Sequence, residues 1–581
     1  MSTENHQTMI RKNKTIHTVF LALLTITLFS YCGCKPEAPK TTGKAVPTDE
    51  TSTDKSSPDN SSDNSTAAET TKETTEETST VDSQIKTEDV AVAPKSNALE
   101  TSETSVESGA INGDLGSVDW DSMVGQQITI TGELVVVDTH DLARRGQVKL
   151  ARERIHVPTS QIDPNDADAD ATSFEGGSNV AKVVRRQKQN DSATITLDDG
   201  SSDQNVFPPK LFPNLGKTHP SVRVGSVLKG VTGKLVKQRR RFFLVPSEPL
   251  QWTPVTRPKR PDVGKADVTV SSFNVLNYFT TIDNGSNNAR GADSQSEFRR
   301  QEAKIVAAII ELNSDVVGLM EIENNLEAEI QLVAALNKAI GSEVFKGCGI
   351  PDGFAETPGG NNAIRVGFIY RTDRVTPVGD VSMVRDGAFD VARTPIVQTF
   401  KSKTAGKPFT VIVNHFKSKG GSKADAANRN KGDGQGAFNA TRRAQSLAIC
   451  DYISQLSQGD EQPRVLVVGD LNAYAQEDPI DAMRAKGLVD LQERFEMETG
   501  SKGTSKAPHY SYIYRGQSGS LDHAMATESL AADVTGIGTW HINADEPRFL
   551  DYNEEFNPKS LYQPDPFRSS DHDPVLIGIR N

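Results

Sequence analysis

Short polar motifs at the ends of apolar segments constrain this chain more than any other feature of its sequence. They are Asn274 in SSFNVLN, Glu321 in GLMEIEN, Asn414-His415 in VIVNHFKSK, Asp470 and Asn472 in VVGDLNAY, Asp522-His523 in SLDHAM, and Asp571-His572 in SSDHDPV. Most of them follow a β-branched apolar run of the kind that forms buried strands. Because the strands of a packed sheet deliver their end residues to a common rim, we expect these side chains to meet there.

Each of these residues also has an ordinary structural explanation. Asn274 could cap a turn, Glu321 could begin a helix, and His415 could be a hydrogen-bonded core histidine. The set as a whole is harder to explain in this way, because a carboxylate buried at a strand end without a partner is costly. A shared divalent cation removes that cost. Carboxylates, carboxamides and two histidines are also the groups that metal-assisted phosphodiester cleavage requires.

The chemistry suggests a role for several of these side chains. A hard cation such as Mg²⁺ takes oxygen ligands, and Glu321 with Asn274 is the best candidate pair. A water nucleophile needs a base, which His572 with a neighbouring aspartate could provide. The leaving oxygen needs a donor or a stabilising group, and His415 is available for that.

Charge divides the chain into regions. At 581 residues the chain is too long for a single domain, and its net charge is −13. Residues 35–114 carry 7 basic and 17 acidic residues, so most of the acidity lies there and says little about the substrate. This region is rich in Ser and Thr, and we expect it to be a disordered stalk. A leftover spacer would have the same composition.

The N-terminus is typical of an export signal. Three basic residues precede the apolar segment 18–31, which is too short to span a bilayer comfortably. Gly33-Cys34 resembles the end of a bacterial lipobox. We therefore expect residues 1–34 to be a signal peptide, with the protein either anchored in the outer or cytoplasmic membrane by lipid at Cys34, or secreted. A plain cleaved signal and an uncleaved anchor are the alternatives. The lipid would be the only membrane contact, and no obligate protein partner is evident.

Residues 115–253 predict a small all-β unit. Short alternating runs at 128–132, 134–137, 193–197, 227–235 and 241–245 are broken by Gly, Pro and Asp, as in a five-stranded barrel. Clusters of basic residues, one of them beside Phe242 and Phe243, suit a nucleic-acid strand. A solvated charged face is the alternative, because the unit also holds 16 acids against 18 basic residues. The basic, Pro-rich segment 254–265 predicts an interdomain linker.

From residue 266 onward, strands and helices interleave. Strands are predicted at 268–275, 316–320, 364–370, 409–413, 465–468 and 575–579, and helices at 296–313 and near 442–456. Mixed strands with helices outside them imply a layered α/β sandwich, and the chain as a whole an α+β protein. Cys348 and Cys450 are the only cysteines in this part, and an oxidising compartment would permit one disulfide.

Residues 266–581 resemble the endonuclease/exonuclease/phosphatase superfamily, and its DNase I-like branch in particular. SFNVLN, LMEIEN, NHFKSK, GDLNAY, LDHAM and SSDHDPV match the motifs of that superfamily in order. The resemblance implies a four-layered α/β sandwich. It also implies the site residues, which are Asn274, Glu321 and Asp571 for the metal, His415 and His572 as the histidine pair, Asp522 to orient a histidine, and Asp470 and Asn472 to orient the nucleophile. Arg393 in ARTP, Tyr370 in GFIYR, and Asn414 would contact phosphate or substrate.

The loop at 417–444 resembles that of secreted bacterial nucleases, which carry an OB-like module ahead of the DNase I-like domain. RRGQVKLARERIHVPTSQID and ITLDDGSSDQNVFPPK are similar to that module, so residues 115–253 are expected to be an OB-like barrel. Ala437-Phe438 stands where those nucleases often have Cys-Trp. Asp433 could be an extra metal ligand or a turn residue, and the turn is favoured.

The resemblance implies an exported hydrolase that cleaves the phosphodiester bonds of DNA, or also of RNA. The expected cofactor is a divalent metal, Mg²⁺ first and Mn²⁺ or Ca²⁺ as alternatives. A phosphatase or phosphodiesterase for lipid or sugar phosphates would use the same residues. A surface protein that binds nucleic acid without cleaving it is the third alternative, although it would require the loss of a motif residue and every motif is present.

Overall fold

The computed structural model describes residues 109–165, 178–217, 219, 221–404, 406–421, 424–457, 462–498 and 508–580. All of them belong to one compact unit, Pro58–Asn581. The predicted signal peptide with Cys34, and residues 35–108 of the predicted stalk, lie outside the described residues. The end of that stalk is structured, because β1 (Gly109–Ile111) pairs with the next strand. Within the described ranges, no helix is both long and apolar enough to cross a bilayer.

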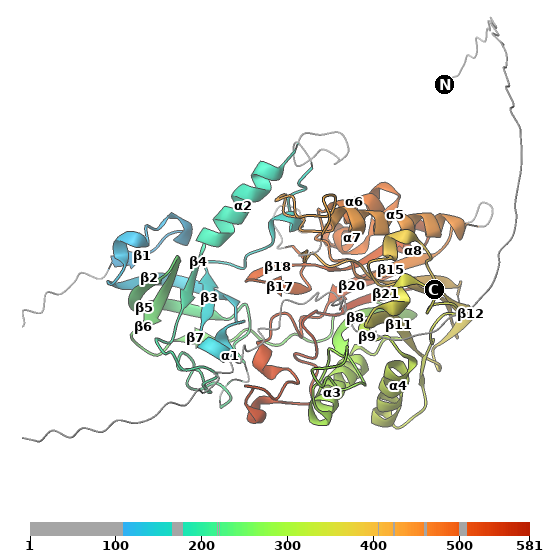
Figure 1. Ribbon diagram of the computed structural model, residues 1–581, viewed down its shortest axis with the longest axis horizontal. Coiled ribbons are helices and arrows are strands. Elements are labelled where there is room, and N and C mark those ends of the chain that lie inside the picture. Colours follow the sequence, from blue (N-terminus) through green and yellow to red (C-terminus); the bar gives the residue numbers. More distant parts are fainter. Residues whose placement is uncertain are drawn as a thin grey trace, which may run out of the picture. The chain divides into compact units, whose positions relative to one another are not determined.

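The first sheet closes on itself (Figure 1). Its ring consists of β2 (Gln127–Asp138), β3 (Val148–Ala151), β4 (Thr194–Leu197), β6 (Arg241–Pro246) and β5 (Val227–Gln238), and β5 pairs back onto β2. Short β7 (Trp252–Thr253) adds to β5. Alternate residues of β2, such as Ile128 and Ile130, are fully buried inside the ring, as the period of two predicts. Five strands thus pair as a closed sheet, and the OB-like assignment of this barrel stays a prediction.

Two helices in the described part of residues 115–253 correct the all-β expectation, the four-residue α1 (Leu142–Arg145) and the longer α2 (Val180–Ser192). The basic segment that includes Lys182 and Arg186 is α2, which directly precedes β4. Its valines have helical spacing, and Val183 is the one that is buried. Lys, Arg and Gln are good helix formers, so a single buried valine is enough to set the helix on the surface.

Two six-stranded sheets build the second part of the unit. The order in the first is β10-β11-β9-β8-β21-β20, and in the second β12-β13-β14-β15-β19-β16. The first sheet comprises β8 (Val268–Tyr278), β9 (Val316–Glu323), β10 (Phe345–Gly347), β11 (Ile364–Arg371), β20 (Val534–Thr539) and β21 (Val575–Ile579). The second comprises β12 (Val375–Met383), β13 (Ile396–Ser402), β14 (Phe409–His415), β15 (Val465–Asp470), β16 (Leu488–Asp490) and β19 (Asp522–Thr527). A separate hairpin consists of β17 (Tyr512–Tyr514) and β18 (Gln517–Gly519).

Helices cover the outer faces of both sheets (Figure 1). α3 (Gln295–Leu312) and α4 (Leu326–Ile340) pack on the first sheet, and α5 (Asn439–Gln455) and α6 (Asp478–Ala485) pack on the second. Strand β14 shows how the layers form, because Val411 and Val413 enter the core between the sheets while Ile412 packs under α5. The order helix, sheet, sheet, helix confirms the predicted layered sandwich. The remaining helices are the short α1 (Leu142–Arg145), α7 (Leu491–Glu498) and α8 (Glu528–Ala531).

Every strand and helix predicted for residues 266–581 occurs, with ends that differ by a few residues. The predicted linker 254–265 is fixed along its length. Arg257 pairs with Glu546, and Arg260 donates to the carbonyl oxygen of Leu312. The thiols of Cys348 and Cys450 are free, and each packs against a different core, so these two cysteines form no disulfide.

Truncating the core between the two sheets should destabilise the fold. Phe400 is fully buried, and its ring lies 5.8 Å from that of Phe368 and 6.3 Å from that of Phe409. We expect Phe400→Ala to lower the free energy of unfolding by about 3–5 kcal/mol, measured by urea denaturation. Val378→Ala, at an exposed position in β12, should change it by less than about 0.5 kcal/mol. Equal effects of the two substitutions would contradict this assignment of the core.

Candidate active site

The predicted polar residues lie at one rim of the two sheets. In the second sheet, His415 pairs with Asp470 and Asp470 pairs with Asp522 across β14, β15 and β19. In the first sheet, Asn274 lies toward the end of β8, and His572 comes just before β21, which runs antiparallel to β8. The rim is therefore where strands such as β14 and β15 end and where the antiparallel strands β19 and β21 begin.

Glu321 reaches this rim through an irregular backbone. Its φ is +63°, a left-handed conformation that is uncommon for a glutamate, and the pairing of β9 with β11 shifts its register at this point. Met320 faces the core between the sheets, and Ile322 faces α3 and α4. The extra residue turns the Glu321 side chain inward, toward Asn274 and His415. Backbone strain of this kind is usually retained for function.

The side chains form one continuous set of contacts. Asn274 Nδ2 donates to Glu321 Oε1 at 3.2 Å, and His415 Nε2 lies 3.9 Å from that same oxygen. His415 Nε2 also lies 3.4 Å from Asp470 Oδ2, and His572 Nε2 lies 3.9 Å from that oxygen on the other side. Asp470 thus stands between the two histidines.

His572 is held by Asp522, at 2.7 Å between Nδ1 and Oδ2. The Ser511 hydroxyl donates to the same carboxylate oxygen at 2.6 Å. Burial by itself lowers the pKa of His572, but attraction to Asp522 and Asp470 outweighs it and raises the pKa well above 6.5. The surroundings of His572 thus favour its protonated form.

His415 has the opposite protonation. It is almost fully buried, and within the described residues its Nδ1 atom has no hydrogen-bond partner. Burial first, and then the positive charges of Arg393 and His572, lower its pKa well below 6.5. The two histidines differ in charge because their surroundings differ, which is the pattern of an acid–base pair.

Three carboxylates lie beside the histidines. Burial raises the pKa of Asp470 to about 7, against the attraction of His572. Burial and the negative charge of Asp571 raise the pKa of Glu321. Arg393 is also buried, and burial lowers its pKa to about 10 although Glu321 and Asp470 attract it. The guanidinium therefore supplies positive charge from below the rim.

Asn274, Glu321 and Asp571 fit a divalent cation. Glu321 is buried next to a second carboxylate, a repulsion that a cation would remove. Among the described residues, the Asp571 carboxylate makes no hydrogen bond and is thus available as a ligand. All three offer oxygen atoms, which Mg²⁺, Mn²⁺ and Ca²⁺ accept. A separate acidic group, Asp293, Glu297 and Glu555, includes none of these residues.

The family model for the endonuclease/exonuclease/phosphatase family matches residues 271–572, which is more than half of the chain. The chain belongs to this family. The match spans the rim residues from Asn274 to His572. Members of this family include nucleases, phosphodiesterases and phosphatases, they are generally hydrolytic, and they typically use a divalent metal.

Several solved structures resemble part of this family member. The catalytic domain of human Nocturnin with bound sulfate is 16% identical, with a TM-score of 0.35, and the match covers 54% of this chain and 95% of that one. The mannosyl-6-phosphatase of Bacteroides thetaiotaomicron is 15% identical, with a TM-score of 0.35, and the match covers 54% of this chain and 100% of that one. D. rerio TDP2 with a single-strand DNA product is 13% identical, with a TM-score of 0.33, and the match covers 54% of this chain and 99% of that one. No curated protein sequence matches the chain.

Two predicted substrate contacts do not reach the rim. Tyr370 pairs with Val316 at the opposite end of the first sheet and packs against Phe400. The reason is that β11 runs antiparallel to β9, so its last residues point away from Glu321. Asn414 alternates with His415 and is fully buried, and its Nδ2 donates to the carbonyl oxygens of Ile412 and Val468. The Tyr370 ring therefore lies in the core, and the Asn414 amide is bound within the second sheet.

The other predicted residues keep positions at the site. Asn472 donates its backbone N–H to Asp470 Oδ1 at 2.9 Å, from a left-handed backbone with φ of +47°. Arg393 Nη1 donates to the carbonyl oxygen of Phe416, the residue after His415. Asp433 is a turn residue, because its carboxylate accepts the N–H of Gln435 at 3.0 Å. The favoured interpretation of Asp433 is thus supported.

Sequence reasoning missed several residues of the site. The ring of Tyr512 lies against His572, with centroids 4.6 Å apart. Asn543 holds the loop before β21, because its Nδ2 donates to the His572 carbonyl oxygen and its Oδ1 accepts from Ser569 and Ser570. The motifs gave no signal for either residue, since both lie outside them, Tyr512 ten residues before Asp522 and Asn543 well before His572.

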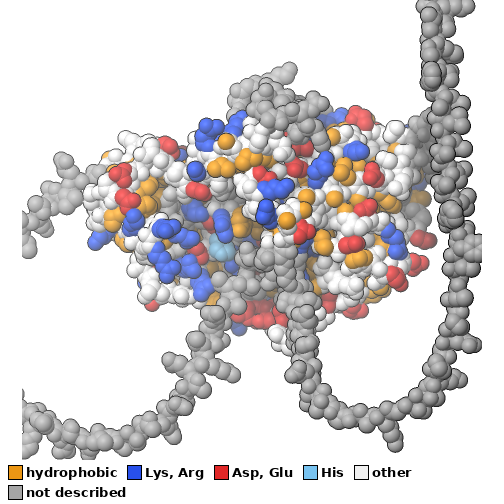
Figure 2. Space-filling view, turned by 45° about the horizontal axis from the view of Figure 1, so that its top comes forward, with side chains coloured by type: hydrophobic (Ala, Val, Ile, Leu, Met, Phe, Trp, Pro, Cys, Tyr) orange, Lys and Arg blue, Asp and Glu red, His pale blue; other side chains and the backbone are white. Residues whose placement is uncertain are grey.

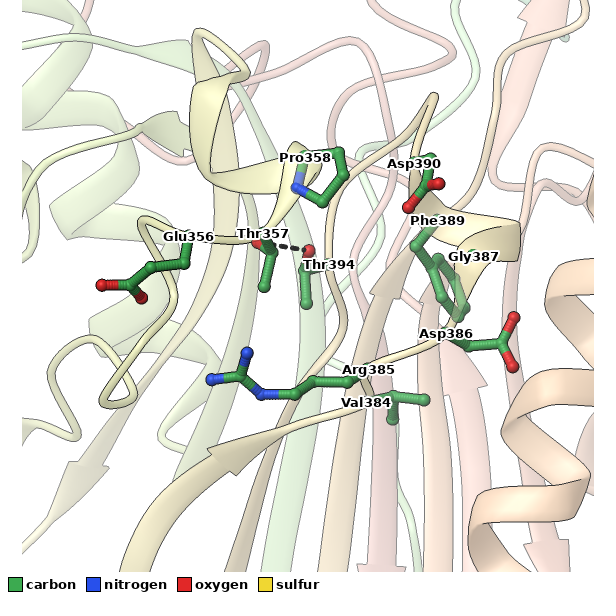
Figure 3. A pocket seen from close by; sticks show the side chains of 10 residues that line it. All are labelled: Glu356, Thr357, Pro358, Val384, Arg385, Asp386, Gly387, Phe389, Asp390 and Thr394. Carbon is green, nitrogen blue, oxygen red and sulfur yellow. Dashed lines mark hydrogen bonds between the residues drawn. The ribbon is translucent and has the colours of Figure 1, made fainter. Parts of the chain in front are cut away.

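Figure 3 shows a cavity of about 270 Å³. One wall is Glu356, Thr357 and Pro358, and the other consists of residues 384–387, 389 and 390. Between them the hydroxyls of Thr357 and Thr394 lie 3.1 Å apart. Thr394 directly follows Arg393, so the cavity is a neighbour of the site, and its lining includes none of the rim residues.

Arg154, from the chain after β3, supports the loop of His572. Its guanidinium lies 4.3 Å from the ring centroid of Tyr510 and pairs with Asp545 at 3.0 Å. Tyr510 stacks on His541, with centroids 3.9 Å apart and planes at 4°. His541 in turn contacts Asp573, next to His572, at 2.9 Å. Arg154, on the barrel side of the unit, is thus connected to the His572 loop through the stacked rings of Tyr510 and His541.

Replacing Asp522 by Asn should lower the pKa of His572. Asp522 attracts the protonated ring and accepts its hydrogen bond, and both oppose the effect of burial. Without that negative charge burial dominates, so the ring should lose its proton at a lower pH than in the wild type. The measurement is an NMR titration of ring-labelled histidine in metal-free protein. The exposed His140 serves as the internal control, and an unchanged His572 titration would show that Asp522 does not set its charge.

Removing the Arg154 side chain should slow turnover without weakening substrate binding. We expect Arg154→Ala to lower kcat by about 10- to 100-fold, because a small displacement of a reacting group is enough to do so. Arg154→Lys, which keeps the charge near Asp545, should recover part of the loss. Arg144→Ala, at an exposed position, is the control. A rise in KM with unchanged kcat would instead place Arg154 in substrate binding.

Proposed function

We propose that this protein is an exported, divalent-metal-dependent nuclease that hydrolyses phosphodiester bonds of DNA, or also of RNA. The observation that supports it most directly is the set of contacts in which Asp470 lies between His415, whose surroundings favour the neutral ring, and His572, whose surroundings favour the protonated ring. The family is hydrolytic, and this arrangement provides both a proton acceptor and a proton donor on one rim.

The proposed reaction is direct attack of water on phosphorus. A divalent cation held by Asn274, Glu321 and Asp571 would neutralise charge on a non-bridging phosphate oxygen. Asp470, with its pKa about 7, would orient the water and accept one proton as the new O–P bond forms. Asn472 keeps the Asp470 carboxylate in place through its backbone N–H.

The leaving oxygen would take its proton from His572 as its bond to phosphorus breaks. Asp522 stabilises the charge on His572 before that transfer. His415 lies on the other side of Asp470, with its Nε2 atom 3.4 Å from Asp470 Oδ2. This distribution differs from the sequence-based role of His572 as the base, because Asp522 and Asp470 favour the protonated ring.

Charge favours nucleic acid as the substrate over lipid or sugar phosphates. On the face in Figure 2, Lys and Arg side chains gather in several clusters. Helix α2, on the barrel side, also carries the exposed basic residues Lys182, Arg185 and Arg186. A chain of phosphates binds to such a surface at many points, whereas a single phosphate ester uses one. The export signal, and an anchor at Cys34, remain part of the proposal for location.

The proposed function predicts metal-dependent nicking of supercoiled plasmid DNA. The purified protein should nick DNA with Mg²⁺ or Mn²⁺, and an excess of EDTA should stop the reaction. His415→Ala and His572→Ala should each lower the rate by about 10²-fold or more. His140→Ala, which replaces an exposed histidine that is not among the rim residues, should keep the wild-type rate.

Two other results would each support a different function. Intact DNA together with cleavage of a sugar phosphate or phospholipid would support the phosphatase or phosphodiesterase alternative. Intact DNA that is retained by the protein on a gel would support a nucleic-acid-binding protein without catalysis.

A further inference from the structure

The hairpin β17–β18 carries an aromatic side chain outward from the catalytic histidine. Tyr512, at the start of β17, lies against His572 with ring centroids 4.6 Å apart. Side chains two residues apart share one face of a strand and lie about 7 Å apart, so Tyr514 continues the same face. Tyr514 thus lies one step further along β17 from the side chain that contacts His572.

Tyr514 is an exposed aromatic residue with a cation beside it. It is 43% exposed, which is unusual for a side chain so close to a buried site. The guanidinium of Arg515, itself exposed, lies 5.1 Å from the ring centroid. An exposed aromatic ring next to an arginine is the arrangement on which nucleobases stack, because every base has a π-face and the strand carries negative charge.

The hairpin is held rigidly in place from the barrel side. Arg515 and Gly516 have φ of +52° and +84°, as in the two-residue turns that suit the twist of a hairpin. Lys149 Nζ donates to the Arg515 carbonyl oxygen at 2.9 Å, and Ser518 N donates to the Ile155 carbonyl oxygen at 2.8 Å. A surface fixed before the substrate arrives loses little conformational entropy on binding.

A row of basic side chains continues from the hairpin along α2. Asn190 Nδ2 donates to Gln517 Oε1 at 2.7 Å, which places one face of α2 beside β18. Arg186 and Lys182 lie four and eight residues before Asn190, so they share that face, and both are exposed. Their charge complements a phosphate backbone that leaves the site along the helix.

We propose that Tyr514 and Arg515 form a stacking site for a nucleobase next to the scissile phosphate of a single nucleic-acid strand. The phosphates beyond that base follow Arg186 and Lys182. This inference rests on the proposed nuclease function and deepens it, because it selects an unpaired strand with bases over a phosphate ester that has none. The alternative is that Tyr514 is a solvated hairpin residue without a role in binding.

The test compares a normal single-stranded oligonucleotide with one of the same length in which every nucleotide is abasic. Tyr514→Ala should raise KM for the normal oligonucleotide about tenfold, the share of one stacked base, and leave kcat nearly unchanged. KM for the abasic oligonucleotide should not change. Tyr514→Phe keeps the ring and should retain the wild-type KM for both substrates.

Phe556→Ala is the matched control, because Phe556 is 71% exposed and is not part of the hairpin. An unchanged KM in Tyr514→Ala, or an equal rise for both oligonucleotides, would overturn the stacking site while the nuclease function stands. If the wild-type protein cleaves neither oligonucleotide but hydrolyses a small phosphate ester, the proposed function fails, and the stacking site fails with it. Thermal melting of each variant checks that the fold is intact.

Discussion

The contact between Asp522 and His572 joins the two sheets at their rim, and the site depends on it. Asp522 begins a strand of the second sheet, while His572 directly precedes a strand of the first. The approach of Glu321 to His415 crosses between the sheets in the same way. Because both contacts require the sheets to pack in one register, the apolar core between them fixes the distances on which proton transfer depends. The packing of the core therefore also sets the geometry of the site.

The site concentrates charge in a place where charge is costly. Glu321, Asp470 and Arg393 are all largely buried, and each is shifted toward its neutral form. The cost is offset mutually, since acids and bases alternate around the rim. The need to bring these groups together also explains the left-handed backbone at Glu321 and Asn472, because ordinary strand geometry would direct their side chains elsewhere. A cation that binds at Asn274, Glu321 and Asp571 would relieve the largest remaining repulsion.

Much of this fold could be predicted from the sequence, for definite reasons. Runs such as those at 465–468 and 575–579 are β-branched and apolar, and their periodicity identifies buried strands. The rim residues could be found because each follows or precedes such a run. Tyr370 was expected at the site only from the resemblance of GFIYR to the family, and the structure places it at the other end of the first sheet, beside Val316. Helix α2 and the hairpin were missed, because one buried valine and three-residue strands leave almost no periodic signal.

The arginines of this protein differ in exposure, so salt ions reach some of them far more easily than others. Buried arginines hold the barrel against the catalytic sheets, whereas exposed ones are accessible to a substrate. Arg223 is 3% exposed and pairs with fully buried Glu546, while Arg186 is exposed. Mobile ions screen exposed charges within about 10 Å at moderate ionic strength, but they reach buried pairs poorly. Under the proposed function, rising salt concentration should weaken contacts between exposed arginines and a phosphate backbone before it breaks buried pairs such as Arg223 with Glu546. The barrel would then stay attached to the catalytic sheets while the nucleic acid dissociates.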